Sequence, residues 1–215
     1  MKKKKLLLLV ITVAAVGLFV TACGKKKIDY LVLVNKQTKL PDDWEETVEL
    51  SDAKDFEGGT IQVEKEALEQ FYKLQEDLHK EGVDIVLDSA YRSVAKQQKL
   101  WDEWSTDPEK GPEYVKKYVA VPGYSEHHTG LAIDIAIEKD GKVIYDNDEM
   151  IAERDIFAKI HAKLADYGFI LRYLEGREDS TGYTYEPWHL RFVKDVDVAK
   201  EIMSKNLTLE EYLAK

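Results

Sequence analysis

Apolar side chains recur every three or four positions along residues 66–80, a spacing that places them on one face of a helix. Gly82 follows this stretch, at the position where a helix C-terminal cap belongs. A second helix is predicted from Ser93, a suitable N-cap, to about residue 104. Two more helices are predicted over residues 112–119 and 153–167.

The last residues contain a capping box, Thr208 followed three positions later by Glu211, which predicts a short helix at the C-terminal end. Four segments have the pattern of strands: residues 83–87, 131–137, 169–173 and 189–193. The apolar residues 30–34 form either a further strand or a docked segment. Helices and strands come in mixed order, and loops such as residues 139–142 suit hairpins. This order predicts an α+β fold with a largely antiparallel sheet.

The first residues have the pattern of an export signal. Four lysines at positions 2–5 precede an apolar run over residues 6–20, which is short for a membrane span. Cys23 is the only cysteine and follows Val-Thr-Ala, an arrangement similar to the lipobox of bacterial lipoproteins. We therefore expect residues 1–22 to be a lipoprotein signal peptide, 23–29 a lipidated cysteine with a short basic tether, and 30–215 the folded domain.

The net charge limits the choice of partners. Removal of residues 1–22 takes away four lysines and no acids, so the formal charge changes from -10 to -14. An acidic domain is a poor partner for nucleic acid, because phosphate binding needs a basic face. We expect instead an extracytoplasmic protein held at the bacterial cell membrane through Cys23.

Two motifs about fifty residues apart carry the candidate chemistry. In the first, His127 precedes a strand in which Asp134 shares a face with two alanines, while the isoleucines point to the other face. In the second, Glu186 precedes His189, and Pro187 between them favours a turn or a bulge. We interpret His189 as the head of a strand beside that of Asp134, with Glu186 hanging from the turn before it.

These residue types match a catalytic zinc site, in which three protein ligands leave one position open for water. His127, Asp134 and His189 provide the three ligands, and the remaining Glu186 can serve as a general base. Each residue alone has an ordinary alternative, since a single His or Asp on an apolar strand is often a satisfied structural group. His128 is next to His127 in sequence, so its side chain points elsewhere.

At these motifs the chain resembles the zinc-dependent D-alanyl-D-alanine carboxypeptidases of the VanY type, including the related L,D-carboxypeptidases that trim peptidoglycan stem peptides. The resemblance covers about residues 33–193 and rests on Leu33-Val34-Asn35-Lys36, Ser89-Ala90-Tyr91-Arg92-Ser93 with Gln97, residues 122–134, and residues 186–193. It implies the hedgehog/D-Ala-D-Ala-peptidase-type α+β fold and one Zn²⁺ per chain. Peptidoglycan stem peptides ending in D-alanine are the implied substrates.

Carried over position by position, the resemblance makes His127, Asp134 and His189 the zinc ligands and Glu186 the catalytic base. It makes Arg92 the group that meets the substrate carbonyl, although a surface ion pair is the ordinary alternative for an arginine at a strand-to-helix junction. Ser125 and Gln97 resemble substrate contacts of the family, but both residue types also cap turns and helices.

Two other functions remain open at this stage. One is a non-catalytic, zinc-stabilised module that binds wall peptides, since one fold can host different functions; the presence of Glu186 favours the enzyme. The other is a solute-capturing lipoprotein, which usually needs two lobes and a longer chain. The sequence does not distinguish tetrapeptide from pentapeptide substrates.

Overall fold

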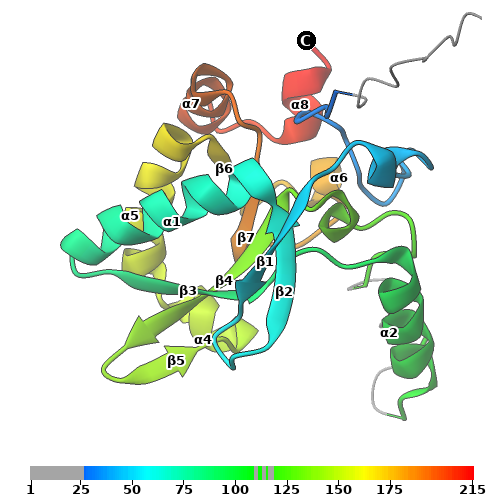
Figure 1. Ribbon diagram of the computed structural model, residues 1–215, viewed down its shortest axis with the longest axis horizontal. Helices are drawn as coiled ribbons and strands as arrows, with labels where there is room; N and C mark the ends of the chain where they lie inside the picture. The colour runs from blue at the N-terminus through cyan, green and yellow to red at the C-terminus, as the bar shows by residue number, and fades with distance from the viewer. Residues whose placement is uncertain (1–26, 109–110, 113–114, 116–118) are drawn as a thin grey trace, which may run out of the picture.

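A five-stranded antiparallel sheet forms the centre of the computed structural model, which describes residues 27–215 apart from 109–110, 113–114 and 116–118 (Figure 1). Its strand order is β3-β4-β7-β6, with β5 paired to the end of β4. The strands are β3 (Asp84–Ser89), β4 (Ala132–Lys139), β5 (Lys142–Ile144), β6 (Phe169–Tyr173) and β7 (Glu186–Phe192). The β4–β5 hairpin turns through Asp140 and Gly141, both of which have positive φ.

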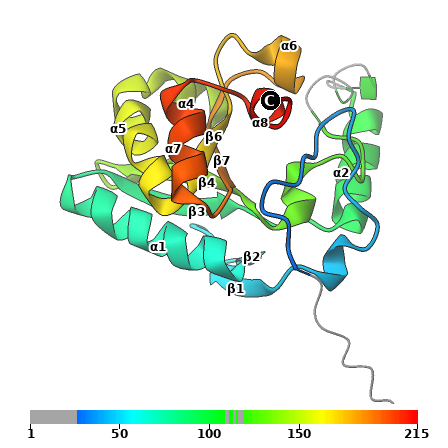
Figure 2. The same ribbon diagram turned by 90° about the horizontal axis from the view of Figure 1, so that it is seen from above.

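The apolar face of this sheet is covered by two helices, α1 (Lys65–Lys80) and α5 (Arg154–Leu164). In Figure 1 and Figure 2 they lie together on one side, while α2 (Val94–Thr106) stands apart on the other. The isoleucines of β4 enter the main hydrophobic core, together with apolar residues of α1 and α5. Because side chains alternate along a strand, Asp134 faces the opposite side, toward a polar cleft.

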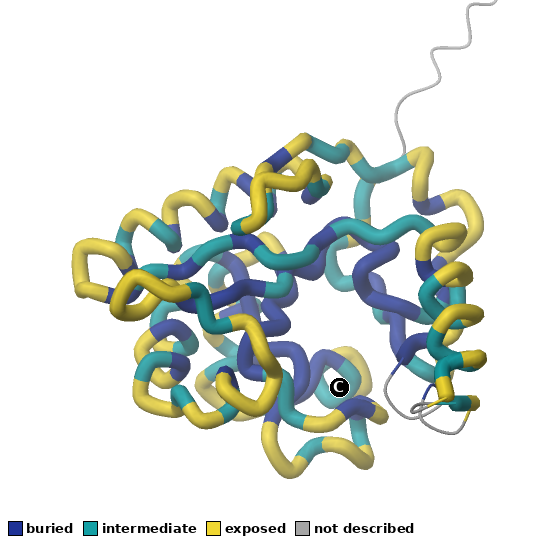
Figure 3. Tube along the Cα trace, turned by 90° about the horizontal axis from the view of Figure 1, so that it is seen from below, coloured by how far each residue is buried: buried dark blue, intermediate teal, exposed yellow. Residues whose placement is uncertain are grey.

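The remaining elements surround this framework. They are η1 (Trp44–Glu46), the hairpin β1 (Leu50–Lys54) and β2 (Thr60–Glu64), η2 (Glu126–Thr129), α4 (Asn147–Ala152), η3 (Ala165–Tyr167), α6 (Glu178–Thr181), α7 (Val196–Ser204) and α8 (Leu209–Leu213). Helices α7 and α8 pack on β6 through a second apolar cluster built around Ile170, Val193 and Ile202. In Figure 3, buried positions concentrate in the central strands and exposed positions on the outer turns of the helices.

The fold class is as the sequence predicts. Helix α1 follows the predicted apolar spacing, the Ser93 hydroxyl caps α2, and the capping box of Thr208 and Glu211 is present at α8. The hairpin β1–β2 and helices α4, α6 and α7 were not predicted. Residues 30–34 form no strand; they dock against Arg191, which donates to the carbonyls of Tyr30 and Val32.

Some expectations concern residues that the structure does not describe. The predicted signal peptide and Cys23 lie outside the described residues, as do most positions of the helix predicted over 112–119. Among the residues that are described, no helix has both the length and the apolar content needed to cross a bilayer.

Candidate active site

Backbone pairing brings two of the predicted ligands together. Strands β4 and β7 are antiparallel neighbours in a register that sets Asp134 directly opposite His189. The third, His127, lies in η2, and Gly130 is the C-cap of this short helix. Gly130 has φ +72°, and a Cβ there would lie 2.7 Å from Cδ2 of Leu50, so only glycine turns the chain from η2 into β4 without strain.

The potential ligand atoms of His127, Asp134 and His189 all lie within 4.8 Å of one another. Asp134 Oδ2 is 3.1 Å from His127 Nε2, and Asp134 Oδ1 is 2.9 Å from His189 Nδ1. The two imidazole rings are nearly perpendicular, with centroids 5.0 Å apart. The structure thus brings together all three predicted ligands.

The outward-facing ring nitrogens fix how each imidazole is presented. His127 Nδ1 lies 2.7 Å from the carbonyl oxygen of Ala90, which can only accept, so Nδ1 is the donor and Nε2 faces Asp134. His189 Nε2 lies 3.2 Å from Oε2 of Glu126, which leaves Nδ1 toward Asp134. Ligating histidines are oriented in this way, by a hydrogen bond from the other ring nitrogen.

A cation fits between these atoms. Oδ1 of Asp134 is buried and has no hydrogen-bond partner among the described residues, although His189 Nδ1 is close. Two acceptor atoms at this distance repel unless a proton or a metal ion lies between them. Two nitrogens and one carboxylate are a donor set that suits zinc. The residues present therefore match a zinc site with three protein ligands.

The charges of the metal-free site point the same way. Burial opposes ionisation of Asp134, but the two imidazoles hold the pKa of its carboxyl well below the ordinary range. Burial also disfavours a charged His189, yet Asp134 and Glu126 raise its pKa to about 10. In the metal-free site, a proton on His189 therefore balances the negative charge of Asp134, and a metal ion that binds there replaces this proton.

Glu186 is the fourth residue of this group. The sequence suggested that Glu186 lies in a turn before the strand, and this was wrong. Glu186 is the first residue of β7 and pairs with Tyr173 of β6. The register of β6 and β7 shifts between the pair Leu171–Leu190 and the pair Tyr173–Glu186. This irregularity confirms the expected bulge and places Glu186 on the same side of the sheet as His189. Glu186 Oε2 is 3.9 Å from His189 Nδ1, too far for a hydrogen bond.

The pKa of Glu186 differs from that of an ordinary glutamate. Burial, opposed by His189 and reinforced by the negative charges of Asp134 and Glu126, raises this pKa to about 7. A carboxyl group with a pKa near neutrality can both accept and return a proton at physiological pH.

Arg92 lies between β3 and α2 and faces the same cleft. Its Nη1 donates to Oε1 of Gln97 at 3.0 Å and its Nη2 to Oγ of Ser89 at 3.4 Å. Burial lowers the pKa of Arg92, with Asp134 opposing this effect; an arginine side chain nevertheless remains a cation in proteins. Arg92 is therefore an inward-facing charge, and no salt bridge joins it to another of the described residues.

Gln97 and His128 support Arg92 from two sides. Gln97 is fully buried, and its amide nitrogen donates to the carbonyl of Ala120 at 2.8 Å, so both ends of the amide are engaged within the protein. Nδ1 of His128 lies 2.5 Å from the carbonyl oxygen of Arg92, and its Nε2 accepts from the backbone N–H of Gly123. The side chain of His128 thus points away from the ligands, as expected, and is buried.

A cleft of about 430 Å³ contains the whole site. The cleft is lined by all seven residues predicted as metal ligands, catalytic groups or substrate contacts: Arg92, Gln97, Ser125, His127, Asp134, Glu186 and His189. Two further residues that line the cleft were not predicted: Asp88, at the β-bulge in β3, and Tyr173, whose ring packs on His189 at a centroid distance of 4.7 Å. Glu126 was not predicted either, although it is a carboxylate directly beside His127 in the sequence.

Comparison with known proteins adds an independent line of evidence. Residues 60–195 match the family model described as "VanY: D-alanyl-D-alanine carboxypeptidase". The bifunctional D-Ala-D-Ala dipeptidase and carboxypeptidase VanXYC of Enterococcus gallinarum is 42% identical over 131 residues, which are 60% of this chain and 66% of that protein. The chain thus matches about two thirds of the length of this relative.

Two solved structures resemble the fold closely. The LdcB LD-carboxypeptidase has a TM-score of 0.73 and 34% identity, covering 89% of this chain and 94% of its own. The vancomycin resistance D,D-pentapeptidase VanY, solved in complex with Zn(II), has a TM-score of 0.70 and 29% identity, covering 86% of this chain and 98% of its own.

Proposed function

Because the chain belongs to the VanY family of D-alanyl-D-alanine carboxypeptidases, we propose that it is a zinc-dependent carboxypeptidase that removes the C-terminal D-alanine from peptidoglycan stem peptides. The observation that carries this proposal is the convergence of His127, Asp134 and His189 in one cleft with Glu186 beside them. The solved relatives include both a D,D-pentapeptidase and an LD-carboxypeptidase, so both stem-peptide lengths are candidate substrates.

His127 would hold the metal ion through Nε2, His189 through Nδ1, and Asp134 through its carboxylate. A zinc ion bound there supplies Lewis-acid chemistry, polarising the scissile carbonyl and making water a better nucleophile near neutral pH. The hydrogen bonds from His127 to Ala90 and from His189 to Glu126 keep both rings in the orientation that ligation requires.

Glu186 performs the proton transfers. With a pKa of about 7 in the metal-free site, its carboxylate accepts a proton from the attacking water and then passes it to the leaving amine of D-alanine. Its distance of 3.9 Å from His189 Nδ1 keeps it apart from the ligand set. This separation favours the enzyme over a zinc-stabilised binding module, which needs no such base.

Arg92 contributes a fixed positive charge. Negative charge develops on the carbonyl oxygen during attack, and a cation already positioned there stabilises the transition state more than the ground state. The hydrogen bond to Gln97 holds the guanidinium in place before substrate binds, which reduces the reorganisation that catalysis requires.

Two substitutions separate metal binding from catalysis. Glu186→Ala should retain zinc and lose hydrolysis, whereas His189→Ala should lose both. Zinc content is measured by elemental analysis. Hydrolysis is measured by mass spectrometry of the products formed from tetrapeptide and pentapeptide stems. Activity removed by chelation should return with added zinc. Equal turnover by wild type and Glu186→Ala would refute the catalytic role of Glu186.

We also propose that the enzyme acts outside the cytoplasm, tethered to the membrane through a lipid on Cys23. The support is the sequence alone: a basic start, an apolar run and a cysteine after Val-Thr-Ala. Mass spectrometry of the mature N-terminus tests this proposal. Cys23→Ser should move the protein from the membrane fraction to the soluble fraction; an unchanged distribution would exclude the anchor.

A further inference from the structure

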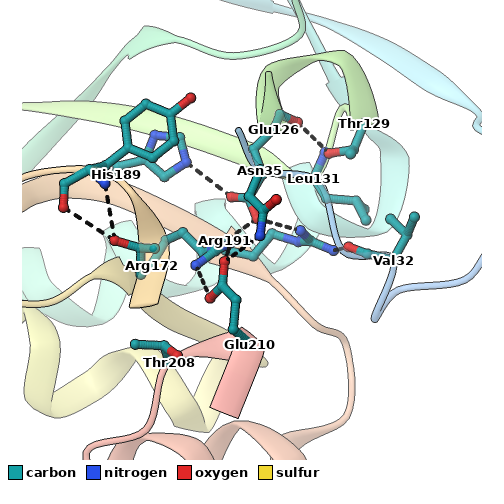
Figure 4. Close-up of polar contacts among 12 residues, drawn as sticks. Val32, Asn35, Glu126, Thr129, Leu131, Arg172, His189, Arg191, Thr208 and Glu210 are labelled. Carbon is teal, nitrogen blue, oxygen red and sulfur yellow. Dashed lines mark hydrogen bonds and ion pairs between the residues drawn. The ribbon is translucent and has the colours of Figure 1, made fainter. Parts of the chain in front are cut away.

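The buried carboxylate of Glu126 connects the candidate metal site to distant parts of the chain (Figure 4). Its side chain has no exposed surface, and Oε2 contacts His189 Nε2 at 3.2 Å. Its other oxygen, Oε1, accepts from Arg172 Nε at 2.6 Å and from Arg191 Nη1 at 2.7 Å. Both guanidinium groups are fully buried, and a buried cation requires an ionised partner, so the carboxyl group of Glu126 is a carboxylate. Glu126 is therefore a fixed negative charge behind His189.

This charge determines which nitrogen of His189 faces the other ligands. An ionised carboxylate can only accept, so Nε2 must carry the hydrogen and Nδ1 is the nitrogen available to a metal ion. If Glu126 moved or rotated, His189 would lose the partner that sets both its tautomer and its ring plane. The position of Glu126 depends in turn on the two arginines.

Arg172 is anchored at its far end by the C-terminal helix α8. Its Nη1 and Nη2 donate to the two carboxylate oxygens of Glu210 at 2.9 Å and 2.7 Å, a bidentate pair. Glu210 Oε1 also accepts from the side-chain amide of Asn35, near the start of the described chain. Arg172 is fully buried, so Glu210 offsets one of the two positive charges that surround Glu126.

Arg191 makes a comparable link to the N-terminal segment. Its Nη2 donates to the carbonyl oxygens of Tyr30 and Val32 at 3.0 Å and 2.9 Å. Two acids and two arginines balance the charge of the network. Asn35 and Glu210 lie outside residues 60–195, the part of the chain that matches the family model. Both terminal segments thus support the metal site from outside that region.

We propose that Glu210 is a positioning residue for the zinc ligand His189, acting through Arg172 and Glu126. The inference rests on the proposed zinc site. Loss of the Glu210 carboxylate leaves the Arg172 guanidinium with Glu126 as its only carboxylate partner among the described residues, so Arg172 draws Glu126 away from His189. Zinc affinity then falls, although Glu210 touches neither the metal ligands nor the cleft.

The test is the Glu210→Gln variant, which keeps the shape of the side chain and removes its charge. The matched control is Glu211→Gln on the same helix, since Glu211 pairs with Arg177 at 2.9 Å and caps α8 through the N–H of Thr208 at 2.9 Å. Zinc dissociation constants are measured by competition with a chromophoric chelator. The visible spectrum of the cobalt-substituted protein reports ligand geometry, and circular dichroism verifies folding.

Glu210→Gln should weaken zinc binding about tenfold, the lower end of the effect expected for an outer-sphere partner, and should alter the cobalt spectrum. Glu211→Gln should lower thermal stability and leave both zinc readouts unchanged. Glu126→Gln provides a second variant, with a larger loss of zinc affinity expected. Wild-type zinc affinity in Glu210→Gln would overturn the proposal, as would equal losses in both helix variants. If the wild-type protein bound no zinc, the metal site itself would fail instead.

Discussion

Replacement of Gln97 by methionine tests how the protein holds its candidate catalytic arginine. Methionine has a similar volume but can neither accept from Arg92 nor donate to Ala120, so one part-buried and one buried hydrogen bond disappear. A buried bond to a charged group contributes about 2 kcal/mol and a neutral one about 1 kcal/mol. The free energy of unfolding should therefore fall by about 3 kcal/mol. Urea denaturation of the zinc-loaded protein measures this change.

The same substitution should lower activity without disturbing the metal. Among the described residues, the Arg92 side chain would keep only its 3.4 Å hydrogen bond to Ser89. A misplacement of about 1 Å can reduce the rate by about 100-fold. We expect kcat/KM to fall 10- to 100-fold, roughly, with zinc affinity unchanged. The exposed neighbour Gln98, bonded to Asp102, provides the control Gln98→Met, which should change neither stability nor activity appreciably.

A double-mutant cycle decides whether Gln97 acts through Arg92 or contacts the substrate itself. If it acts through Arg92, Gln97→Met should cost nothing further in an Arg92→Ala background. A full additional loss of kcat/KM in that background would refute the positioning role and favour direct substrate contact, as the family resemblance implies. Unchanged kcat/KM in Gln97→Met alone would refute both.

Three further predictions concern stability. Burial, reinforced by the charge of Asp134, raises the pKa of Asp88 to about 6, so the metal-free protein loses stability as the pH rises from about 4 to 6. Asp88→Asn should therefore raise the free energy of unfolding by about 1 kcal/mol at pH 7.5, a value reduced because Asp88 is partly exposed. At pH 4 the same substitution should have almost no effect. Gly130→Ala should destabilise by more than about 1 kcal/mol, because the positive φ strains alanine and its Cβ must also displace the end of the Leu50 side chain, whereas Gly176→Ala, with a nearly equal φ and open space, should cost about 1 kcal/mol in urea denaturation. Zinc at 100 times its dissociation constant should raise stability by about 2.7 kcal/mol in wild type and not in His127→Ala, as calorimetry can measure.

The sequence could predict elements whose signals are local. Helix α1 has regular apolar spacing, α2 has the Ser93 cap, and α8 has the capping box, so each is recognisable from a short window. The candidate ligands were equally visible, because burying Asp134 and His189 in strands, with His127 just before one of them, is costly unless these groups bind one another or an ion. The strand pattern also predicted that the strands of Asp134 and His189 are neighbours, whereas the register that sets these two residues opposite each other comes from the structure.

Other features depend on contacts between distant residues. The hairpin β1–β2 contains mostly polar residues and buries few side chains, so its pattern is weak. Glu186 was assigned to a turn because Pro187 suggested one, whereas pairing with Tyr173 keeps it in the strand. Gln97 could be placed on a helix, but its bond to the carbonyl of Ala120 joins segments 23 residues apart.

Arg172 and Arg191 carry a further signal that is visible in the sequence. Each is a charged residue between two apolar neighbours in a strand, β6 or β7, and each is fully buried. A buried arginine needs a carboxylate, and an ionised carboxylate needs more than one donor, so two such arginines predict a shared acid. Glu126 fits that requirement from the sequence alone, because it stands beside His127 within the same motif. The identity of the second acid, Glu210, follows only from the three-dimensional packing of α8 against β6. Buried charges in apolar strands thus identify a support network, but its full membership requires the fold.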